Sequence, residues 1–244
     1  MRNTGVMSAH RTARARARAA ITDEIMSEAR RQLAAEGAAA LSLRSIAREL
    51  GMVSSAIYRY VDSRDDLLTR LIIEAYDALG DAAETAVSSS AGQPDAERWV
   101  ATALAIRDWA LARPHEYLLL YGTPVPGYVA PDDTVTPGTR VTLALLSIVR
   151  DASIDSRLSP TAVELDTPAQ LATDLARLGS IVDLDVPPAT FVAVLAAWTQ
   201  LFGLLGFELS NQTRGVVEDH AALFAATARL GALSIGLTDR SAAA

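Results

Sequence analysis

Two residue types are missing from this chain of 244 residues, which contains neither cysteine nor lysine. Without cysteine, disulfide frameworks, thiolate metal sites and cysteine nucleophiles are excluded. The lack of lysine is what codon usage in a GC-rich genome would produce, and we attach no function to it. Aromatic residues make up only 5% of the chain, whereas strong helix formers such as Ala, Leu and Arg are abundant. The composition therefore favours helices.

Long apolar runs are missing as well. No run of about 18 uninterrupted apolar residues occurs, and the arginine-rich N-terminus is not followed by the apolar core of a signal peptide. We therefore expect a soluble, cytoplasmic protein that does not enter a membrane.

Motifs for catalysis and metal binding are a third absence. The three histidines, His10, His115 and His220, lie far apart and show no metal-ligand spacing. The chain also lacks GxSxG, a phosphate-binding loop and a paired His–carboxylate motif. The sequence thus predicts no catalytic residue, no metal and no cofactor, and a helical enzyme is the competing class of protein.

Charge is distributed unevenly along the chain. The formal net charge is −7, but residues 1–70 hold 12 arginines against 8 acidic residues, a net charge of +4. The other 174 residues hold 10 arginines against 21 acidic residues, a net charge of −11. A basic head on an acidic body is expected when only one end of a protein meets phosphate groups.

Apolar residues recur at helical spacing through most of the chain, and no strand pattern or internal repeat competes. The fold is therefore predicted to be all-α. The helix at 187–209 is nearly all apolar, so we expect it to be buried on all sides. Helices are predicted, with glycine, proline or serine at many of their ends, at 21–36, 43–50, 54–60, 67–79, 99–111, 115–121, 139–151, 168–178, 187–209 and 215–237.

The first three of these helices have the proportions of a helix-turn-helix unit, in which the last helix enters the DNA major groove. Ser42 stands where the N-cap of the second helix belongs, and Gly51 supplies a turn residue that tolerates positive φ. Hydroxyls, a guanidinium and phenols are left to face outward from the third helix.

The residues of this region closely resemble the DNA-binding domain of the tetracycline-repressor (TetR) family. The match comprises Ser42 opening the second helix, Ile46-Ala47, Gly51, Tyr58, Tyr60 and Ser63-Arg64-Asp65. One departure is Val53, which stands where the family usually has a Ser or Thr that caps the recognition helix. Ser54 caps in its place, or the cap is lost.

The resemblance implies two kinds of DNA contact. The residues that would contact phosphates are Ser42, Arg44, Tyr58, Tyr60 and Arg64, and those that would face base edges are Ser54, Ser55, Ala56 and Arg59. The alternatives are a core role for Tyr58 and a solvated side chain at Arg59, with a similar choice at Tyr60 and Arg64.

The resemblance also implies a domain division. We expect a basic flexible arm at 1–20, a helix-turn-helix DNA-binding domain at 21–66 and a larger helical regulatory and dimerisation domain at 67–240. The arginines of the arm, Arg11, Arg14, Arg16 and Arg18, reach phosphates or an adjacent minor groove, or belong to a frayed, solvated tail.

The C-terminal part resembles a branch of the family that is named for a Trp-His-Gly signature. The similar stretches are 107–128 and Trp198-Thr199-Gln200-Leu201-Phe202-Gly203, in which Phe202 occupies the histidine position, so no role of that histidine transfers. The residues predicted to line an effector cavity are Trp99, Trp109, His115, Tyr117, Tyr121, Tyr128, Trp198 and Phe202. For each of the aromatic residues among them, core packing is the alternative.

These expectations describe a ligand-responsive regulator. We expect a homodimer through the last two helices, with Gly203 and Gly206 permitting close approach, and with Phe202, Leu205 and Leu209 in the seam or else in the monomer core. The partners are a palindromic double-stranded DNA operator and a small apolar effector, and repression is the expected mode. The alternatives are an activator, or a small-molecule binding protein of the same fold without a repressor role.

Overall fold

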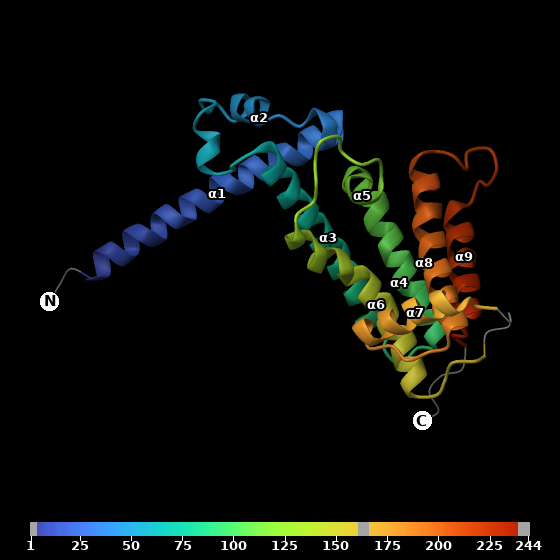
Figure 1. The fold of residues 1–244 in the computed structure, drawn as a ribbon. Coiled ribbons are helices and arrows are strands. Elements are labelled where there is room, and N and C mark those ends of the chain that lie inside the picture. Colours follow the sequence, from blue (N-terminus) through green and yellow to red (C-terminus); the bar gives the residue numbers. More distant parts are fainter. Residues whose placement is uncertain (1–3, 161–165, 239–244) are drawn as a thin grey trace. The chain divides into compact units, whose positions relative to one another are not determined.

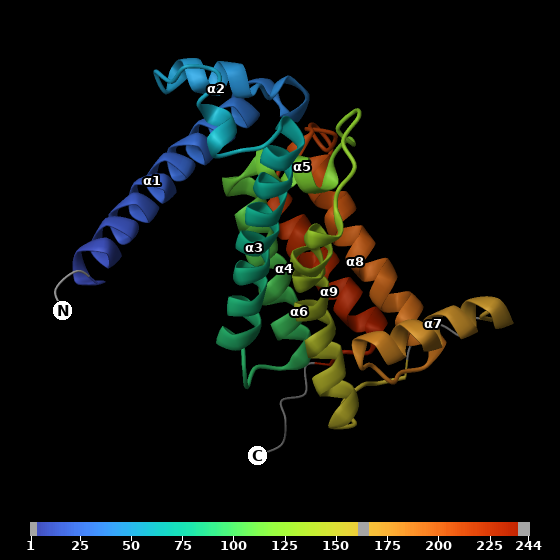
Figure 2. The ribbon, with the colours of Figure 1, turned by 60° about the vertical axis from the view of Figure 1, so that its left-hand side comes forward.

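The computed structural model describes residues 4–160 and 166–238, with side chains from Arg14 onward. Within these ranges the chain is all-helical, without strands, as the sequence predicted (Figures 1 and 2). The α-helices are α1 (Thr4–Glu36), α2 (Leu43–Glu49), α3 (Arg64–Ser89), α4 (Asp95–Ala112), α5 (Pro114–Tyr121), α6 (Val135–Ile154), α7 (Ala169–Val182), α8 (Pro188–Leu209) and α9 (His220–Ile235). They are accompanied by the 3₁₀ turns η1 (Ala38–Ala40), η2 (Ile57–Arg59) and η3 (Asp132–Thr134).

The helices form two compact units. The N-terminal unit extends to Glu74 and includes Thr123–Thr134, and the C-terminal unit holds Ala75–Gly122 and the chain from Val135. This division falls inside α3, eight residues later than the boundary expected after residue 66, and it assigns part of the expected regulatory region to the first unit.

The N-terminal unit is built on the apolar stripe of α1. Ile25, Ala29 and Leu33 recur every four residues and are buried, and α1 packs against η1 and α2. Ile46 of α2 and Ile57 of η2 are also fully buried. The i, i+4 spacing that predicted an amphipathic helix therefore marks the face that covers this small core.

The N-terminal end of α1 differs from the expectation of a flexible arm before Ile21. The helix already begins at Thr4, and residues 1–3 of the expected arm lie outside the described residues. The physical reason is composition, because the stretch from Arg11 to Ala20 alternates Arg and small residues and contains neither Pro nor Gly. Ala and Arg are among the best helix formers, so nothing stops the helix at that point.

The core of the C-terminal unit surrounds α4. This helix packs against α5, α6, α8 and α9, and α8 packs in turn against α9 and α7. Trp99 and Ile106 of α4, Leu145 of α6 and Phe224 of α9 are buried in one hydrophobic cluster. Both ribbon views show α4, α8 and α9 running side by side (Figures 1 and 2).

The expectation that the apolar helix at 187–209 is buried on all sides was wrong. By length and composition α8 could cross a membrane. In the structure one face of α8 is buried and the other is exposed. Phe191, Leu201 and Leu205 are buried against the other helices, whereas Leu195, Gly203 and Phe207 are exposed. Periodicity could not reveal the second face, because apolar residues occupy both.

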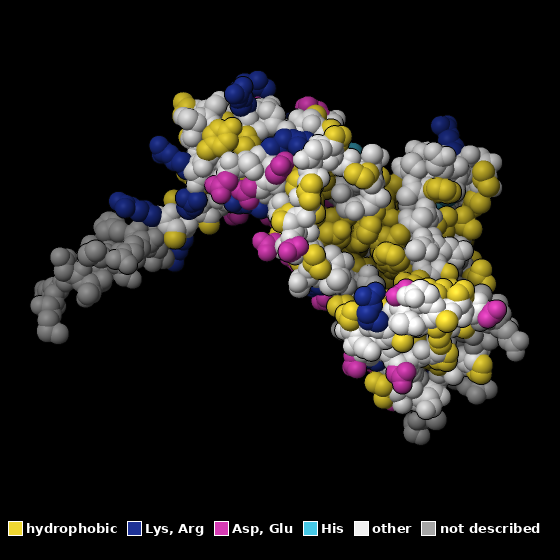
Figure 3. Space-filling view, viewed as in Figure 1, with side chains coloured by type: hydrophobic (Ala, Val, Ile, Leu, Met, Phe, Trp, Pro, Cys, Tyr) yellow, Lys and Arg dark blue, Asp and Glu magenta, His cyan; other side chains and the backbone are white. Residues whose placement is uncertain are grey.

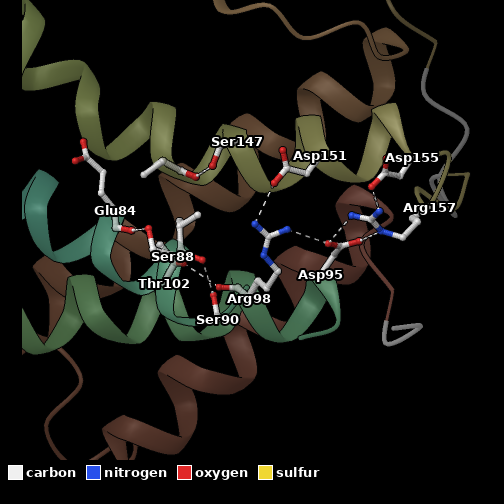
Figure 4. Close-up of polar contacts among 12 residues, drawn as sticks. Glu84, Ser88, Ser90, Asp95, Arg98, Thr102, Ser147, Asp151, Asp155 and Arg157 are labelled. Carbon is white, nitrogen blue, oxygen red and sulfur yellow. Dashed lines mark hydrogen bonds and ion pairs between the residues drawn. The ribbon is translucent and has the colours of Figure 1, made fainter. Parts of the chain in front are cut away.

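A network of ion pairs around the buried carboxylate of Asp95 closes one end of the unit (Figure 4). Asp95, at the start of α4 and 4% exposed in its side chain, accepts from Arg98 at 3.3 Å and from Arg157 at 2.8 and 3.2 Å. Arg98 also reaches Asp151 of α6 at 3.0 Å. Backbone bonds of 2.8 Å from Ser159 to Gly236 and of 3.3 Å from Ala96 to Thr238 fix the C-terminal segment beside it.

We predict that Asp95→Ala lowers the free energy of unfolding by about 3–5 kcal/mol, because it leaves two arginines without their shared carboxylate in a buried site. Urea unfolding followed by circular dichroism measures this change. Asp155→Ala is the matched control, since this exposed carboxylate also pairs with Arg157 and its loss is expected to cost less than about 1 kcal/mol. Equal effects of the two substitutions would contradict the role given to Asp95.

Candidate nucleic-acid interface and aromatic cluster

The second helix of the N-terminal unit begins and ends as its sequence predicts. The Ser42 hydroxyl accepts from the Ser45 amide at 3.4 Å and caps α2. After the helix, Gly51 adopts a φ of 65°, a conformation that costs glycine little. The Met52 amide then donates to the Ala47 carbonyl at 2.8 Å and closes the turn.

The recognition segment is shorter than predicted. A helix over 54–60 was expected, but residues 54–56 form turns and only η2 follows. No side chain caps η2, and Val53 is 71% exposed. The cap is therefore lost rather than transferred to Ser54, because a valine side chain has no acceptor to offer the amides of the first turn.

This short segment still presents its predicted residues. Ile57 is fully buried and anchors the turn, while Ser54, Ser55 and Arg59 are exposed. Tyr58 is 49% exposed, so it does not have the alternative role of a core residue. Two further predicted members, Ala56 and Tyr60, are half-buried.

The Arg64 guanidinium binds backbone carbonyls within the N-terminal unit. Its Nε donates to the Leu41 carbonyl at 3.2 Å, and its Nη2 donates to the carbonyls of Ala38 and Ala39 at 3.0 and 3.2 Å. The guanidinium therefore ties the start of α3 to the segment before α2.

Arg44 and Arg59 carry the available positive charge of the recognition region. Both are exposed, and no carboxylate within residues 4–160 or 166–238 lies within ion-pair distance of either. By contrast, Arg31 pairs with Glu28 at 2.6 Å and Arg70 pairs with Asp66 at 2.9 Å. Exposed, unneutralised guanidinium groups are what phosphates and guanine edges bind.

A cluster of aromatic rings occupies the C-terminal unit. Phe202 of α8 lies 4.6 Å from Tyr121, 5.5 Å from Trp198 and 6.3 Å from Tyr117, measured between ring centroids. Tyr76 of α3 joins them at 6.2 Å from Tyr121. We call these five residues the aromatic cluster. Figure 3 shows a recess lined by hydrophobic side chains between α5 and α8.

The polar groups of the aromatic cluster are neutral. The Tyr117 hydroxyl donates to the Phe202 carbonyl at 2.8 Å, and burial raises the pKa of both Tyr117 and Tyr121 above the usual tyrosine value. The indole nitrogen of Trp198 is buried and has no hydrogen-bond partner among the described residues. The cluster therefore suits a neutral, apolar ligand with a hydrogen-bond acceptor.

Four of the predicted cavity residues lie elsewhere. Trp99 and Trp109 are buried in the core of the unit, where their volume fills the space around α4, and His115 is exposed on α5. Tyr128 belongs to the N-terminal unit, where its hydroxyl lies 2.9 Å from the Thr69 hydroxyl. Whether such a residue lies in the core, on the surface or in a loop of the other unit does not follow from its residue type.

Two features of the C-terminal unit do not follow from the motifs and spacings of the sequence. Tyr76 directly follows Ala75, which belongs to the buried stripe of α3. Its place beside that stripe could have indicated that its ring packs against the core. The buried pair of Arg107 and Glu208, with nitrogen–oxygen distances of 2.5 and 3.0 Å, joins α4 to α8. Its members are 101 residues apart, so no local pattern could have paired them.

A separate cavity of about 350 Å³ lies between α7 and the start of α8. The lining of this cavity includes the apolar residues Leu175, Gly179, Leu184 and Phe191. The acidic residues Asp183 and Asp185 line it as well. It contains none of the residues predicted for ligand binding. The aromatic cluster combines ring faces with an unpartnered buried donor, so we regard the cluster as the stronger candidate site.

Known protein families match both the N-terminal and the C-terminal part of the chain. Residues 25–71 match the family model for bacterial regulatory proteins of the tetR family, and residues 99–230 match that for the C-terminal domain of tetracyclin repressor-like proteins. The second match includes both stretches, 107–128 and 198–203, that resemble one branch of the family.

Individual relatives cover nearly the whole chain. The HTH-type transcriptional regulator Rv1816 of Mycobacterium tuberculosis is 37% identical over 218 residues, which are 88% of this chain and 92% of the relative. The solved structure of a regulatory protein, SCO4313, is 34% identical with a TM-score of 0.71, covering 88% of this chain and 97% of that one. The TetR family regulator PfmR from Thermus thermophilus, 17% identical with a TM-score of 0.57 over 85% and 96% of the two chains, shares the fold.

Proposed function

Because the chain belongs to the tetracycline-repressor family of bacterial transcriptional regulators, we propose that it is a ligand-responsive repressor. In this proposal it binds a palindromic operator in the cytoplasm as a homodimer and is released by a small apolar effector. The observation that carries the proposal is the exposed recognition segment, which presents Tyr58 and the unneutralised Arg59 on a buried anchor, Ile57. The relatives are named as transcriptional regulators, which supports a role without catalysis.

The DNA contacts divide by side-chain chemistry. Arg59, Ser54 and Ser55 project from the recognition segment and are assigned to base edges, together with Ala56. Arg44, Tyr58, Tyr60 and the cap residue Ser42 are assigned to phosphates. Arg64 supports both groups indirectly, because its three bonds to backbone carbonyls hold the segment before α2.

The exposed faces of α8 and α9 support the homodimer. Leu195, Thr199, Gly203 and Phe207 are exposed along one face of α8 at spacings of four. A side chain at Gly203 or Gly206 would meet nothing within 4 Å in the monomer, so a second copy can approach the helix closely there. Leu230 and Leu233 of α9 are exposed as well.

Phe202 and Leu205, expected in the dimer seam, lie in the monomer core, as the alternative had it. Leu209 packs against the same core from its edge. The face that is left for a partner is therefore smaller and is centred on Gly203 and Phe207.

The operator is tested by incubating the purified protein with fragmented DNA of its source organism and sequencing what it retains. We expect a palindromic site with half-sites about 34–36 Å apart, or a multiple of that spacing. On that site Arg59→Ala is expected to cost about 1–3 kcal/mol and to relax specificity at one position of each half-site. Arg44→Ala is expected to weaken binding to all sequences alike, with a shallower salt dependence. Retention of no preferred sequence would contradict the proposal.

The dimer is tested by sedimentation of Phe207→Glu, a carboxylate placed on the exposed face of α8. We expect this variant to be a monomer with weakened operator binding, because burying an unpaired charge at an interface is costly. Ile181→Glu on α7 is the matched control, since Ile181 is 74% exposed outside this face, and it is expected to remain dimeric. A monomeric native protein, or a dimeric Phe207→Glu, would show that another surface or none is used.

The effector site is tested by displacement from the operator with a panel of neutral aromatic, cationic and anionic compounds. We expect neutral aromatic compounds to release the protein, and Trp198→Ala to raise the concentration needed by up to about tenfold because ring contacts are removed. Ser180→Tyr, which obstructs the cavity between α7 and α8, serves as the control and should change nothing. If Ser180→Tyr alone desensitises the protein, the effector binds in that cavity, and compounds that strengthen operator binding would contradict release of the protein by its effector.

A further inference from the structure

We infer that the N-terminal stretch of α1 is a second DNA-contacting element, which lays Arg14 and Arg18 along the phosphate backbone beside the half-site. The inference rests on the proposed function, because it needs the recognition segment to be held on duplex DNA. It assigns to this stretch a contact that is independent of base sequence.

The first observation is the face of α1 on which these arginines lie. Arg18 and Arg14 precede the buried Ile25 by seven and eleven residues, which correspond to about two and three helical turns. They therefore continue the stripe that Ile25, Ala29 and Leu33 bury in the N-terminal unit. Where the unit ends and the stripe is no longer covered, its residues change from apolar to arginine.

The second observation is the contact that orients this face. The Arg18 guanidinium lies 5.4 Å from the centroid of the Tyr60 ring, in the geometry of a cation–π interaction. Tyr60 directly follows η2 and is one of the residues assigned to phosphates. The basic face of α1 is therefore on the same side of the unit as the recognition segment.

The third observation is that the charge on this face is not neutralised. Arg14 and Arg18 are exposed and have no carboxylate within ion-pair distance in the described part of the chain. Asp23 of α1 follows Arg16 by seven residues, so these two share the opposite face. The face that carries Arg14 and Arg18 is thus purely basic.

The partner follows from this chemistry. In both ribbon views the N-terminal half of α1 stands clear of the other elements of its unit (Figures 1 and 2), and in Figure 3 arginine side chains mark its described part. This stretch of α1 is not covered by apolar side chains, and its guanidinium groups lie one helical turn apart. Such a row of positive charges is complementary to a polyanion with closely spaced negative charges. Duplex DNA carries about one negative charge per 3.4 Å of each strand, and it is the polyanion that Tyr60 and Arg59 bind in the proposed function.

The test measures the salt dependence of binding of the full-length protein to two duplexes, the best retained fragment and one of arbitrary sequence, between about 50 and 200 mM salt. We expect the double variant Arg14→Ala/Arg18→Ala to reduce the slope of log K against log salt by about 1.8 per bound protomer, at about 0.9 for each phosphate that is no longer neutralised. The retained sequence should stay the same, because these contacts do not read bases.

Two matched variants separate position from charge. Arg16→Ala removes a charge from the opposite face of the same helix, and Arg177→Ala removes an exposed charge from α7; both should leave the slope unchanged. Arg14→Ala alone, which leaves the Arg18–Tyr60 contact intact, should reduce it by about half as much as the double variant. Arg18→Lys, which keeps the charge, should retain the native slope.

The outcomes distinguish this inference from the proposed function. If the native protein retains a specific site and the double variant keeps the native slope on both duplexes, the contact by α1 is refuted while the operator stands. If no specific site is retained, the duplex of arbitrary sequence still reports on α1, and an unchanged slope there refutes the contact as well. Equal reductions of the slope by Arg16→Ala and Arg14→Ala would refute the assigned face.

Discussion

Charged side chains buried at both ends of α4 constrain the rest of the C-terminal unit. Asp95 and Arg98 at its start are held with Arg157 and Asp151, and Arg107 nearer its end is held by Glu208 of α8. A buried charge without its partner costs several kcal/mol, so each pair permits one register of α4 against α6 and α8. Apolar packing between Ala- and Leu-rich helices alone would tolerate several registers, whereas paired charges do not.

That register determines what α8 can do. With Leu201, Phe202 and Leu205 directed into the core, the Phe202 carbonyl receives the Tyr117 hydroxyl and its ring meets Tyr121 and Trp198. The same rotation leaves Leu195, Gly203 and Phe207 on the surface. One helix thus contributes to the aromatic cluster through one face and to the proposed dimer through the other, so in the proposed function an effector at the cluster would act on the dimer through α8.

In the N-terminal unit, a small hydrophobic core holds the exposed polar side chains of the recognition segment in place. The recognition segment consists only of the turn residues 54–56 and the 3₁₀ element η2, and Val53 does not cap it. Its position depends on the buried Ile57 and on Arg64, which binds three carbonyls ahead of α2. Arg64 thus uses its guanidinium on backbone carbonyls, whereas Arg14 and Arg18, which lie outside the motif that carries the resemblance, are exposed.

The sequence by itself determined the helical class, the α2 cap at Ser42, the turn at Gly51 and the family, because local spacing, capping and turn chemistry are written in neighbouring residues. The sequence also showed that the net positive charge lies within residues 1–70, the part of the chain that includes the helix-turn-helix. Only the tertiary structure decided which aromatic residues cluster, since Trp99 and Tyr117 look alike in sequence but lie in different surroundings, and Tyr128 belongs to the other unit. It likewise decided the two faces of α8 and the pairing of Arg107 with Glu208. These depend on contacts between residues far apart in the chain, whose free energy exists only once the helices are packed.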